Sequence, residues 1–335
     1  MKDVPRRKGK SIDFKQLNRT LDWQQRISEE HNRLSKALSA LRVPLSTCPI
    51  CSCKNHKQFV NIYDYMYVEC VDCGHIFSQA PPDEQAILSL YADESDKHSV
   101  QRQIYIDEEL FKKRIEQIAR PKVDYCSSII PVEGLWVDLG CGTGELLAAA
   151  AEKGWQTKGI EADRAEIEFG RNHGLNIIES DIQLLNAEDL QNTKVLSLLN
   201  LLEHMRNPLA TLVKLVDALP PEACVVIEVP RHPSLSSFVN LAFPNLAYRH
   251  IYAPDHLHIF TEKSTGILLE AAGLKPLALW EFGQDFQHFV SNAAVNAGLK
   301  ESEFLKSVVD VSVAAQQVID DLGFSDVLFI IARKK

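Results

Sequence analysis

The glycine-rich stretch at residues 136–147, WVDLGCGTGELL, most constrains what this chain can fold into. An apolar strand runs directly into three glycines at alternate positions, Gly140, Gly142 and Gly144, and the sequence then resumes as a helix. Glycine tolerates a positive φ and lets another molecule approach the bare backbone closely. Between a strand and a helix, such a loop is typical of ligand binding at the carboxyl edge of an α/β sheet.

From Leu135 onward, short β-rich segments alternate with helical patterns. The segments between the first five strands are long enough for crossover helices, which predicts a mostly parallel sheet covered on both faces. A helical insert at about 284–325 separates the last two strands, and its position suggests a lid or a dimer contact. The predicted strands are 135–139, 156–160, 175–178, 194–199, 223–229, 276–282 and 326–333.

Three segments precede this α/β domain of residues 131–335. Residues 1–45 combine a basic arm, predicted to be disordered up to about residue 12, with an amphipathic helix over 13–42. That helix is expected either to pack on the body of the protein or to pair with a second copy. Residues 46–80 form a compact cysteine-bearing module, and residues 81–130 form a helical linker or cap.

Charge and hydropathy narrow the classes of protein. The formal net charge is −9, which argues against a chain built mainly to bind nucleic acid. No segment reaches the roughly 18–20 apolar residues that a membrane-spanning helix needs. We therefore expect a cytoplasmic protein that does not act at a membrane.

Five of the eight cysteines lie between residues 48 and 73. Two C-x2-C pairs, CPIC and CVDC, offer four thiolates, enough to enclose a tetrahedral Zn²⁺. The predicted ligands are Cys48, Cys51, Cys70 and Cys73. Spacing alone leaves iron open as the metal. A closed site of this kind stabilises a fold and does no chemistry.

Acidic residues around the glycine loop indicate which ligand it binds. Glu161 ends the next strand, about twenty residues downstream, where a carboxylate can accept bonds from a ribose diol. Glu145 stands where a dinucleotide fingerprint has its third glycine, and Asp138 precedes the loop. Carboxylates there would repel a pyrophosphate. They suit a ligand with sulfonium and ammonium charges, which S-adenosylmethionine has.

The motifs VDLGCGTGELL, GIEAD and LLNLLEHMRNP resemble those of the Rossmann-like, class I S-adenosylmethionine-dependent methyltransferases. The resemblance implies a seven-stranded sheet with an antiparallel last strand. The CPIC…CVDCGHIF segment resembles the zinc-binding module of sugar C-methyltransferases and their relatives. One departure is that Lys194 and Val195 stand where the fourth strand often opens with Asp. The implied cofactor-binding residues are Asp138, Gly140, Cys141, Gly142, Gly144, Glu161, Asp181, Asn200, Leu201 and His204.

Methyl transfer requires an aligned acceptor and, for a protonated acceptor, a base. Histidine has a suitable pKa, and four of the eleven histidines lie between residues 232 and 258. In extended chain His256 and His258 would share one face. We predict His256 first, then His258 and Glu228, as catalytic residues. A purely structural role for either histidine, or a metal site formed by both with Asp255, is the alternative.

These observations predict an S-adenosylmethionine-dependent methyltransferase for a small polar acceptor, with a sugar or nucleotide-linked sugar as the leading class. One alternative is an RNA or protein methyltransferase that docks through the zinc module and the basic arm. Another is a methyltransferase-like subunit without turnover. A homodimer formed through the N-terminal helix or the 284–325 insert is a further expectation.

Overall fold

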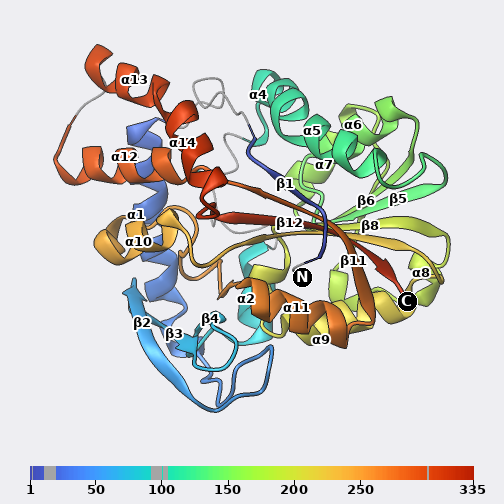
Figure 1. Ribbon diagram of the computed structural model, residues 1–335, viewed down its shortest axis with the longest axis horizontal. Coiled ribbons are helices and arrows are strands. Elements are labelled where there is room, and N and C mark those ends of the chain that lie inside the picture. Colours follow the sequence, from blue (N-terminus) through green and yellow to red (C-terminus); the bar gives the residue numbers. More distant parts are fainter. Residues whose placement is uncertain (2, 11–19, 92–99, 101–104, 300–301) are drawn as a thin grey trace.

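The computed structural model describes residues 1, 3–10, 20–91, 100, 105–299 and 302–335. Its centre is an eight-stranded sheet in the order β1-β11-β12-β9-β8-β5-β6-β7 (Figure 1). Strands β5 to β9 run parallel to one another, whereas β12 is antiparallel to both β9 and β11. The strands are β1 (Arg6–Lys8), β5 (Leu135–Leu139), β6 (Gln156–Glu161), β7 (Ile177–Glu179), β8 (Thr193–Leu199), β9 (Cys224–Pro230), β11 (Leu274–Phe282) and β12 (Val327–Lys334).

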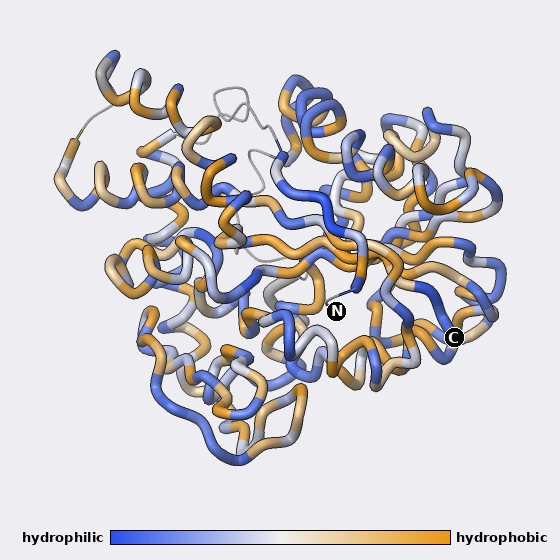
Figure 2. Tube along the Cα trace, viewed as in Figure 1, coloured by the Kyte–Doolittle hydropathy of each residue, from blue (hydrophilic) through white to orange (hydrophobic). Residues whose placement is uncertain are grey.

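Helices cover both faces of this sheet. All seven residues of β9 are buried, as expected for a central strand covered on both sides. Helices α4 to α7 lie on one face and α9 and α11 on the other, and the apolar strands run between them (Figures 1 and 2). The helices are α4 (Glu108–Arg114), α5 (Arg120–Ser127), α6 (Glu145–Lys153), α7 (Arg164–Asn172), α8 (Ala187–Leu190), α9 (Pro208–Ala218) and α11 (Glu262–Ala271), with a π-helical turn at Ile115–Ala119. The α/β fold with a mostly parallel sheet and an antiparallel last strand is confirmed. The sheet has eight strands and not the expected seven, because β1 adds to its edge.

The N-terminal arm differs from the prediction of disorder. Arg6–Lys8 form β1, which pairs in parallel with Leu279–Glu281 of β11. Arg6 donates to Glu281 at 2.7 Å, and the Arg7 guanidinium lies 4.0 Å from the centre of the Trp280 ring. The arm is therefore ordered by ion pairing and by cation–π contact with a strand about 270 residues away. The rest of the predicted arm, residues 11 and 12, lies outside the described residues.

A second, four-stranded sheet carries the cysteine module, in the order β10-β4-β3-β2. Its strands are β2 (His56–Ile62), β3 (Tyr65–Cys70), β4 (Ile76–Ser78) and β10 (His258–Ile259). Strand β10 comes from the α/β domain and pairs antiparallel with β4. Cys48, Cys70 and Phe77 share a core with Val137 and Leu196 of the central sheet. The module thus packs into the α/β domain.

Helix α1 (Leu21–Ala37) packs inside the chain, and residues 13–19 of the predicted helix lie outside the described residues. Gln24 donates to Ser291 at 3.1 Å, and the His31 ring stacks on Tyr252 at 4.5 Å. The 284–325 insert is helical, as predicted. No described helix has both the length and the apolar character to cross a membrane. The remaining helices are α2 (Glu84–Tyr91), α10 (Leu235–Ala242), α12 (Asp285–Asn296), α13 (Glu303–Asp310) and α14 (Ser312–Asp321), with 3-10 turns at Ser39–Leu41, Ile182–Leu184, Leu202–His204 and Pro244–Leu246.

Candidate functional site

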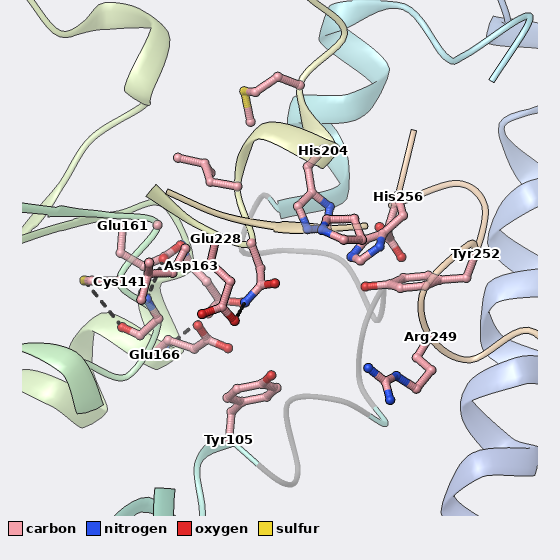
Figure 3. A pocket seen from close by; sticks show the side chains of 18 of the residues that line it. Tyr105, Cys141, Glu161, Asp163, Glu166, His204, Glu228, Arg249, Tyr252 and His256 are labelled. Atoms are coloured by element: carbon pink, nitrogen blue, oxygen red, sulfur yellow. Dashed lines mark hydrogen bonds between the residues drawn. The ribbon is translucent and has the colours of Figure 1, made fainter. Parts of the chain in front are cut away.

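A cavity of about 910 Å³ lies at the carboxyl ends of the central parallel strands. One part, the glycine end, is formed by residues 140–142 and 161–163. The opposite part, the histidine end, is formed by His204, Arg249, Tyr252 and His256. Figure 3 shows these two groups on opposite sides of the view, with Glu228 between them. The cavity therefore joins two chemically different walls.

Glu161 is fixed at the glycine end by main-chain donors. One carboxylate oxygen accepts from the N–H of Gly142 at 2.9 Å, and the other accepts from Ala162 and Asp163 at 2.7 and 3.0 Å. Asp163 also caps α7 by accepting from Ala165 at 2.9 Å. The glycine loop is thus tied to the end of β6, and a carboxylate faces the cavity in a defined orientation.

The three glycines have different tasks. Gly140 and Gly142 line the cavity with φ of 65° and 55°, which favours glycine at both positions. Gly144, at φ 90°, begins α6, and a Cβ atom there would lie 2.5 Å from Leu175. Cys141 lines the cavity beside the first two glycines. Among the described residues Gly144 lies outside the cavity wall, so its observed role is close helix packing.

Asp138 is buried beneath the glycine loop and is not among the described lining residues. Its carboxylate accepts from the Ser197 hydroxyl at 2.5 Å. Burial raises the pKa of Asp138 to about 7, and the Ser197 hydrogen bond opposes that shift. A cation bound above the loop would favour the ionised form.

Asp181, Asn200 and Leu201 all line the cavity, at the ends of β7 and β8. Asp181 accepts from the N–H of Gln183 at 2.8 Å and so begins a 3-10 turn. Asn200 has a φ of 51° and donates through its side chain to Glu228 at 3.2 Å. These predicted residues therefore lie around one cavity.

Glu228 at the end of β9 is held in a buried ion pair. Its carboxylate lies 2.6 Å from the Lys122 ammonium, and both side chains are about 6% exposed. Lys10, which follows β1, also lines the cavity, and burial lowers the pKa of its ammonium well below the usual range. The ion pair with Lys122 fixes the Glu228 carboxylate beside the cavity, where it can orient a ligand.

His256 lies at the histidine end with a defined ring orientation. Its Nδ1 donates to the carbonyl of His250 at 2.7 Å, and its ring packs on Tyr252 with centroids 4.1 Å apart. The Nε2 atom lies 3.8 Å from a Glu203 oxygen. Burial lowers the pKa of the His256 imidazole well below its usual range, so the ring is neutral. With Nδ1 donating, Nε2 carries the free lone pair.

His258 is fully buried and is absent from the described cavity lining. Its Nδ1 faces His75 Nε2 at 3.2 Å, and its Nε2 donates to the Met205 carbonyl at 2.9 Å. The expectation that His256 and His258 share a face is wrong, because the chain turns at 252–256 and only His258 lies in β10. Through these two contacts, His258 links the cysteine module to the 202–205 turn.

The metal site considered for His256, His258 and Asp255 does not form. Asp255 lies 3.7 Å from His31, and His258 faces away. A different trio assembles instead: ligand atoms of Glu203, His204 and His256 lie within 4.8 Å of one another. Glu203 is fully buried, and neither carboxylate oxygen has a hydrogen-bond partner among the described residues.

Several cavity residues carried no local signal in the sequence. Lys10, Lys122 and Arg249 come from a predicted arm, a predicted linker and a loop, and none belongs to a motif. Arg249 pairs with Asp326 at 2.6 Å and Tyr252 stacks on His256. Tyr248 and Tyr252 also line the cavity. Tertiary contacts alone bring these residues to the cavity.

The four predicted metal-binding cysteines converge. The sulfurs of Cys48 and Cys73 are 3.7 Å apart, those of Cys51 and Cys70 are 3.5 Å apart, and all four lie within 4.8 Å. Zinc–sulfur bonds of about 2.3 Å in a tetrahedron place the sulfurs about 3.8 Å apart. Two of the sulfur pairs therefore lie close to the spacing of a tetrahedral metal site, and all four residues are near enough to share one ion.

Parts of this chain are similar to known proteins. The ubiquinone biosynthesis O-methyltransferases of two Vibrio vulnificus strains are 30% identical over 110 residues, 30% of this chain. This chain spans only 46% of those relatives. An Archaeoglobus fulgidus S-adenosylmethionine-dependent methyltransferase structure shares 20% identity and covers 68% of this chain and 97% of its own, at a TM-score of 0.44. The structure of the plantazolicin methyltransferase BpumL, solved with S-adenosylhomocysteine, shares 15% identity with this chain. The match covers 74% of this chain and 94% of BpumL, at a TM-score of 0.48.

The family itself is shown by a longer match. Residues 111–279, just over half of the chain, match a family described as a methyltransferase domain. That span contains the glycine loop, Glu161 and the 200–204 segment, which the structure brings to one cavity. The chain therefore belongs to this family of methyltransferase domains.

Proposed function

We propose that this methyltransferase acts on a small polar acceptor, with a sugar or a nucleotide-linked sugar as the first class to test. The observation that carries the proposal is the single cavity with an acidic glycine end and a histidine end. Its volume of about 910 Å³ lies in the range of small-molecule sites. S-adenosylmethionine supplies the methyl group when bound.

The glycine end would hold the cofactor. Gly140 and Gly142 allow close approach of the ligand, and the fixed Glu161 carboxylate would accept hydrogen bonds from the ribose hydroxyls. Asp181 would lie near the adenine, and Asn200 and Leu201 would flank the cofactor. Asp138 would stabilise its positive charge from below the loop.

The histidine end would bind the acceptor. His256 presents Nε2 as an acceptor toward the cavity, and this lone pair would orient an acceptor hydroxyl or take its proton. Tyr252 packs against the ring and limits its rotation. Glu228, already paired with Lys122, would orient a polar group of the acceptor between the two ends.

Docking of RNA or protein through the basic arm receives no support. Arg6 pairs with Glu281 and Glu262, and Arg7 lies over Trp280, so these cations are already engaged. The net charge of −9 further disfavours a polyanionic partner.

We also propose that zinc occupies the four-cysteine cluster as a structural ion. The sulfur spacing supports this assignment, and four protein thiolates leave no open position for chemistry. A cytoplasmic location is part of this proposal, and clustered cysteines are typical of metal sites in reducing compartments. Metal analysis by mass spectrometry of the native chain would identify zinc or iron.

A homodimer through the insert remains a proposal supported by exposed apolar side chains. Val311, Val318 and Leu322 of the insert are 57–68% exposed, and Phe324 is 49% exposed. Sedimentation of the wild type and of Val318→Ser with Leu322→Ser would test it. A monomer in both cases would exclude this interface.

The experiment that tests the function is a turnover screen. The purified chain is mixed with S-adenosylmethionine and with panels of nucleotide-linked sugars, free sugars and phenols, and S-adenosylhomocysteine release is measured. We expect release with a sugar panel and an acceptor mass increased by one methyl group. Turnover only with phenols would reject the sugar class, and turnover only with RNA or protein would reject a small acceptor.

A further inference from the structure

The buried carboxylate of Glu203 lacks the donors that a group in its position needs. Its side chain is fully buried, and both oxygens are without a hydrogen-bond partner among the described residues. A buried carboxylate is costly unless it is paired with a cation or hydrogen-bonded. Glu203 also lies in the 3-10 turn at the end of β8, next to the cavity residue His204. The Glu203 carboxyl group therefore needs a proton or a bound cation.

The nearer imidazole with a defined orientation, His256, presents a lone pair toward this carboxylate. His256 donates Nδ1–H to the His250 carbonyl at 2.7 Å, which leaves the Nε2 lone pair 3.8 Å from Glu203. Two lone-pair groups that face each other need either a proton or a metal ion between them. Metal-binding histidines typically donate their other N–H to a carbonyl or carboxylate, as His256 does.

The main chain holds the trio together from two distant segments. The N–H of Leu257 donates to the Glu203 carbonyl at 2.8 Å, which joins the 202–204 turn to the histidine loop. Stacking on Tyr252 fixes the ring of His256, and the His204 ring meets it edge-on at 4.8 Å. The donor atoms are thus presented by rigid supports, as a binding site requires.

We propose that Glu203, His204 and His256 form a second metal site, which binds a divalent first-row transition ion such as Zn²⁺ or Mn²⁺. Two imidazoles and one carboxylate suit such ions. All three ligand atoms lie within 4.8 Å, and bonds of about 2.1 Å require them about 3.3 Å apart. Closing on an ion therefore needs movements of about 1 Å at the side-chain tips.

Three protein ligands leave open positions on the ion. Because His204 and His256 line the cavity, these positions face the space that the glycine end also lines. An oxygen of the acceptor, a hydroxyl or an enolisable carbonyl, would bind there. With the ion in place, the ion would orient and polarise that oxygen, and His256 would act through the ion because its Nε2 lone pair is then a ligand. This last step rests on the proposed function, whereas binding of the ion does not.

The test compares metal content between variants that leave the cysteine cluster intact. After equilibrium dialysis against Zn²⁺, we expect Glu203→Gln and His256→Gln to hold one fewer zinc per chain than the wild type. His173→Gln, which removes a partly exposed histidine paired with Glu108, is the matched control and is expected to lose none. The difference is independent of whether the cysteines hold zinc.

Two further measurements distinguish the loss of the second metal site from misfolding of a variant. Zinc X-ray absorption of the wild type reports a nitrogen and oxygen shell beside the sulfur shell if the second site is filled. S-adenosylmethionine affinity of Glu203→Gln shows whether that variant still folds. A sulfur-only spectrum, or equal zinc in wild type and Glu203→Gln, would overturn the metal site and leave a proton shared between Glu203 and His256. Failure of the acceptor screen would leave this metal count unaffected.

Discussion

The glycine end and the histidine end of the cavity are built in different ways. The glycine end uses residues that directly follow β5 and β6, so each functional side chain is placed by a strand end. The histidine end combines a turn after β8 with a loop about fifty residues later, and Tyr252 of that loop stacks on α1. One end depends on local sequence and the other on tertiary packing.

This difference predicts how each end fails. A substitution at the glycine end is expected to change only the local loop and to lower the affinity for the cofactor. Damage far from the histidine end, in the cysteine module or in α1, propagates to the acceptor through β10 and the 252–256 turn. Cofactor affinity and acceptor turnover are therefore separable readouts.

The largest expected effect comes from disrupting the cysteine cluster. Cys70→Ser removes one of four thiolates, and a structural zinc site contributes on the order of 10 kcal/mol to folding of its module. We expect turnover to be abolished, because β4 supports the strand that follows the histidine loop, while cofactor affinity stays within about threefold. Calorimetric titration with S-adenosylmethionine and a turnover assay measure both.

The matched control for that substitution is Cys53→Ser, which changes a cysteine outside the cluster. Cys53→Ser is expected to keep both the turnover and the cofactor affinity of the wild type. Full turnover of Cys70→Ser would show that the two sheets are functionally independent.

The next largest effect separates the two ends directly. His256→Ala removes the imidazole at the histidine end, and loss of a group that takes or orients a proton costs about 10²-fold or more in kcat. Cofactor affinity is expected to remain within about twofold, since the glycine end is untouched. Steady-state kinetics with the identified acceptor checks this, and a kcat within threefold of wild type would transfer the role to another residue.

A smaller effect is expected from Glu161→Ala. Hydrogen bonds to a charged group contribute about 1.5–3 kcal/mol. The loss of ribose binding therefore weakens S-adenosylmethionine affinity by about 10- to 100-fold. Glu133→Ala, an exposed glutamate paired with Lys194, is the control. An unchanged dissociation constant for Glu161→Ala would remove this residue from the cofactor site.

The smallest predicted effect is a pH dependence at the glycine end. Burial raises the pKa of Asp138 to about 7, so this carboxyl is partly protonated near neutrality. A cationic ligand favours the ionised form, and affinity for S-adenosylmethionine therefore rises with pH, by about three- to tenfold between about pH 6 and pH 7.5. Asp138→Asn is expected to flatten this rise, and an identical pH profile in both proteins would contradict it.

The sequence anticipates the parts of the fold that have local causes. All seven predicted strands of the α/β domain are present, because apolar runs between glycine and helix signals identify them without tertiary knowledge. The four clustered cysteines and Glu161 could likewise be predicted from local sequence, by their spacing and by their position after a strand. Their spacing along the chain already determines where they meet.

Long-range pairing explains what the sequence did not predict. Strand β1 is three charged residues, RRK, and only its contacts with Trp280 and Glu281 make it a strand. Likewise, alternation along the chain suggested that His256 and His258 act together, whereas a turn separates them and His75 binds the second. Glu203 lies within the LLNLLEHMRNP motif, but its complete burial depends on the whole fold and could not be predicted from the motif.

The pairing of β10 with β4 sets an order of events during synthesis of the chain. The small sheet begins at His56 but takes its fourth strand from His258–Ile259, about two hundred residues later. Until the ribosome has made that segment, the main-chain groups on the free side of β4 have no strand to bind. The cysteine module is thus among the first parts translated and among the last completed. Its unpaired edge at β4 stays exposed through most of synthesis, which is the time when a chaperone could bind it.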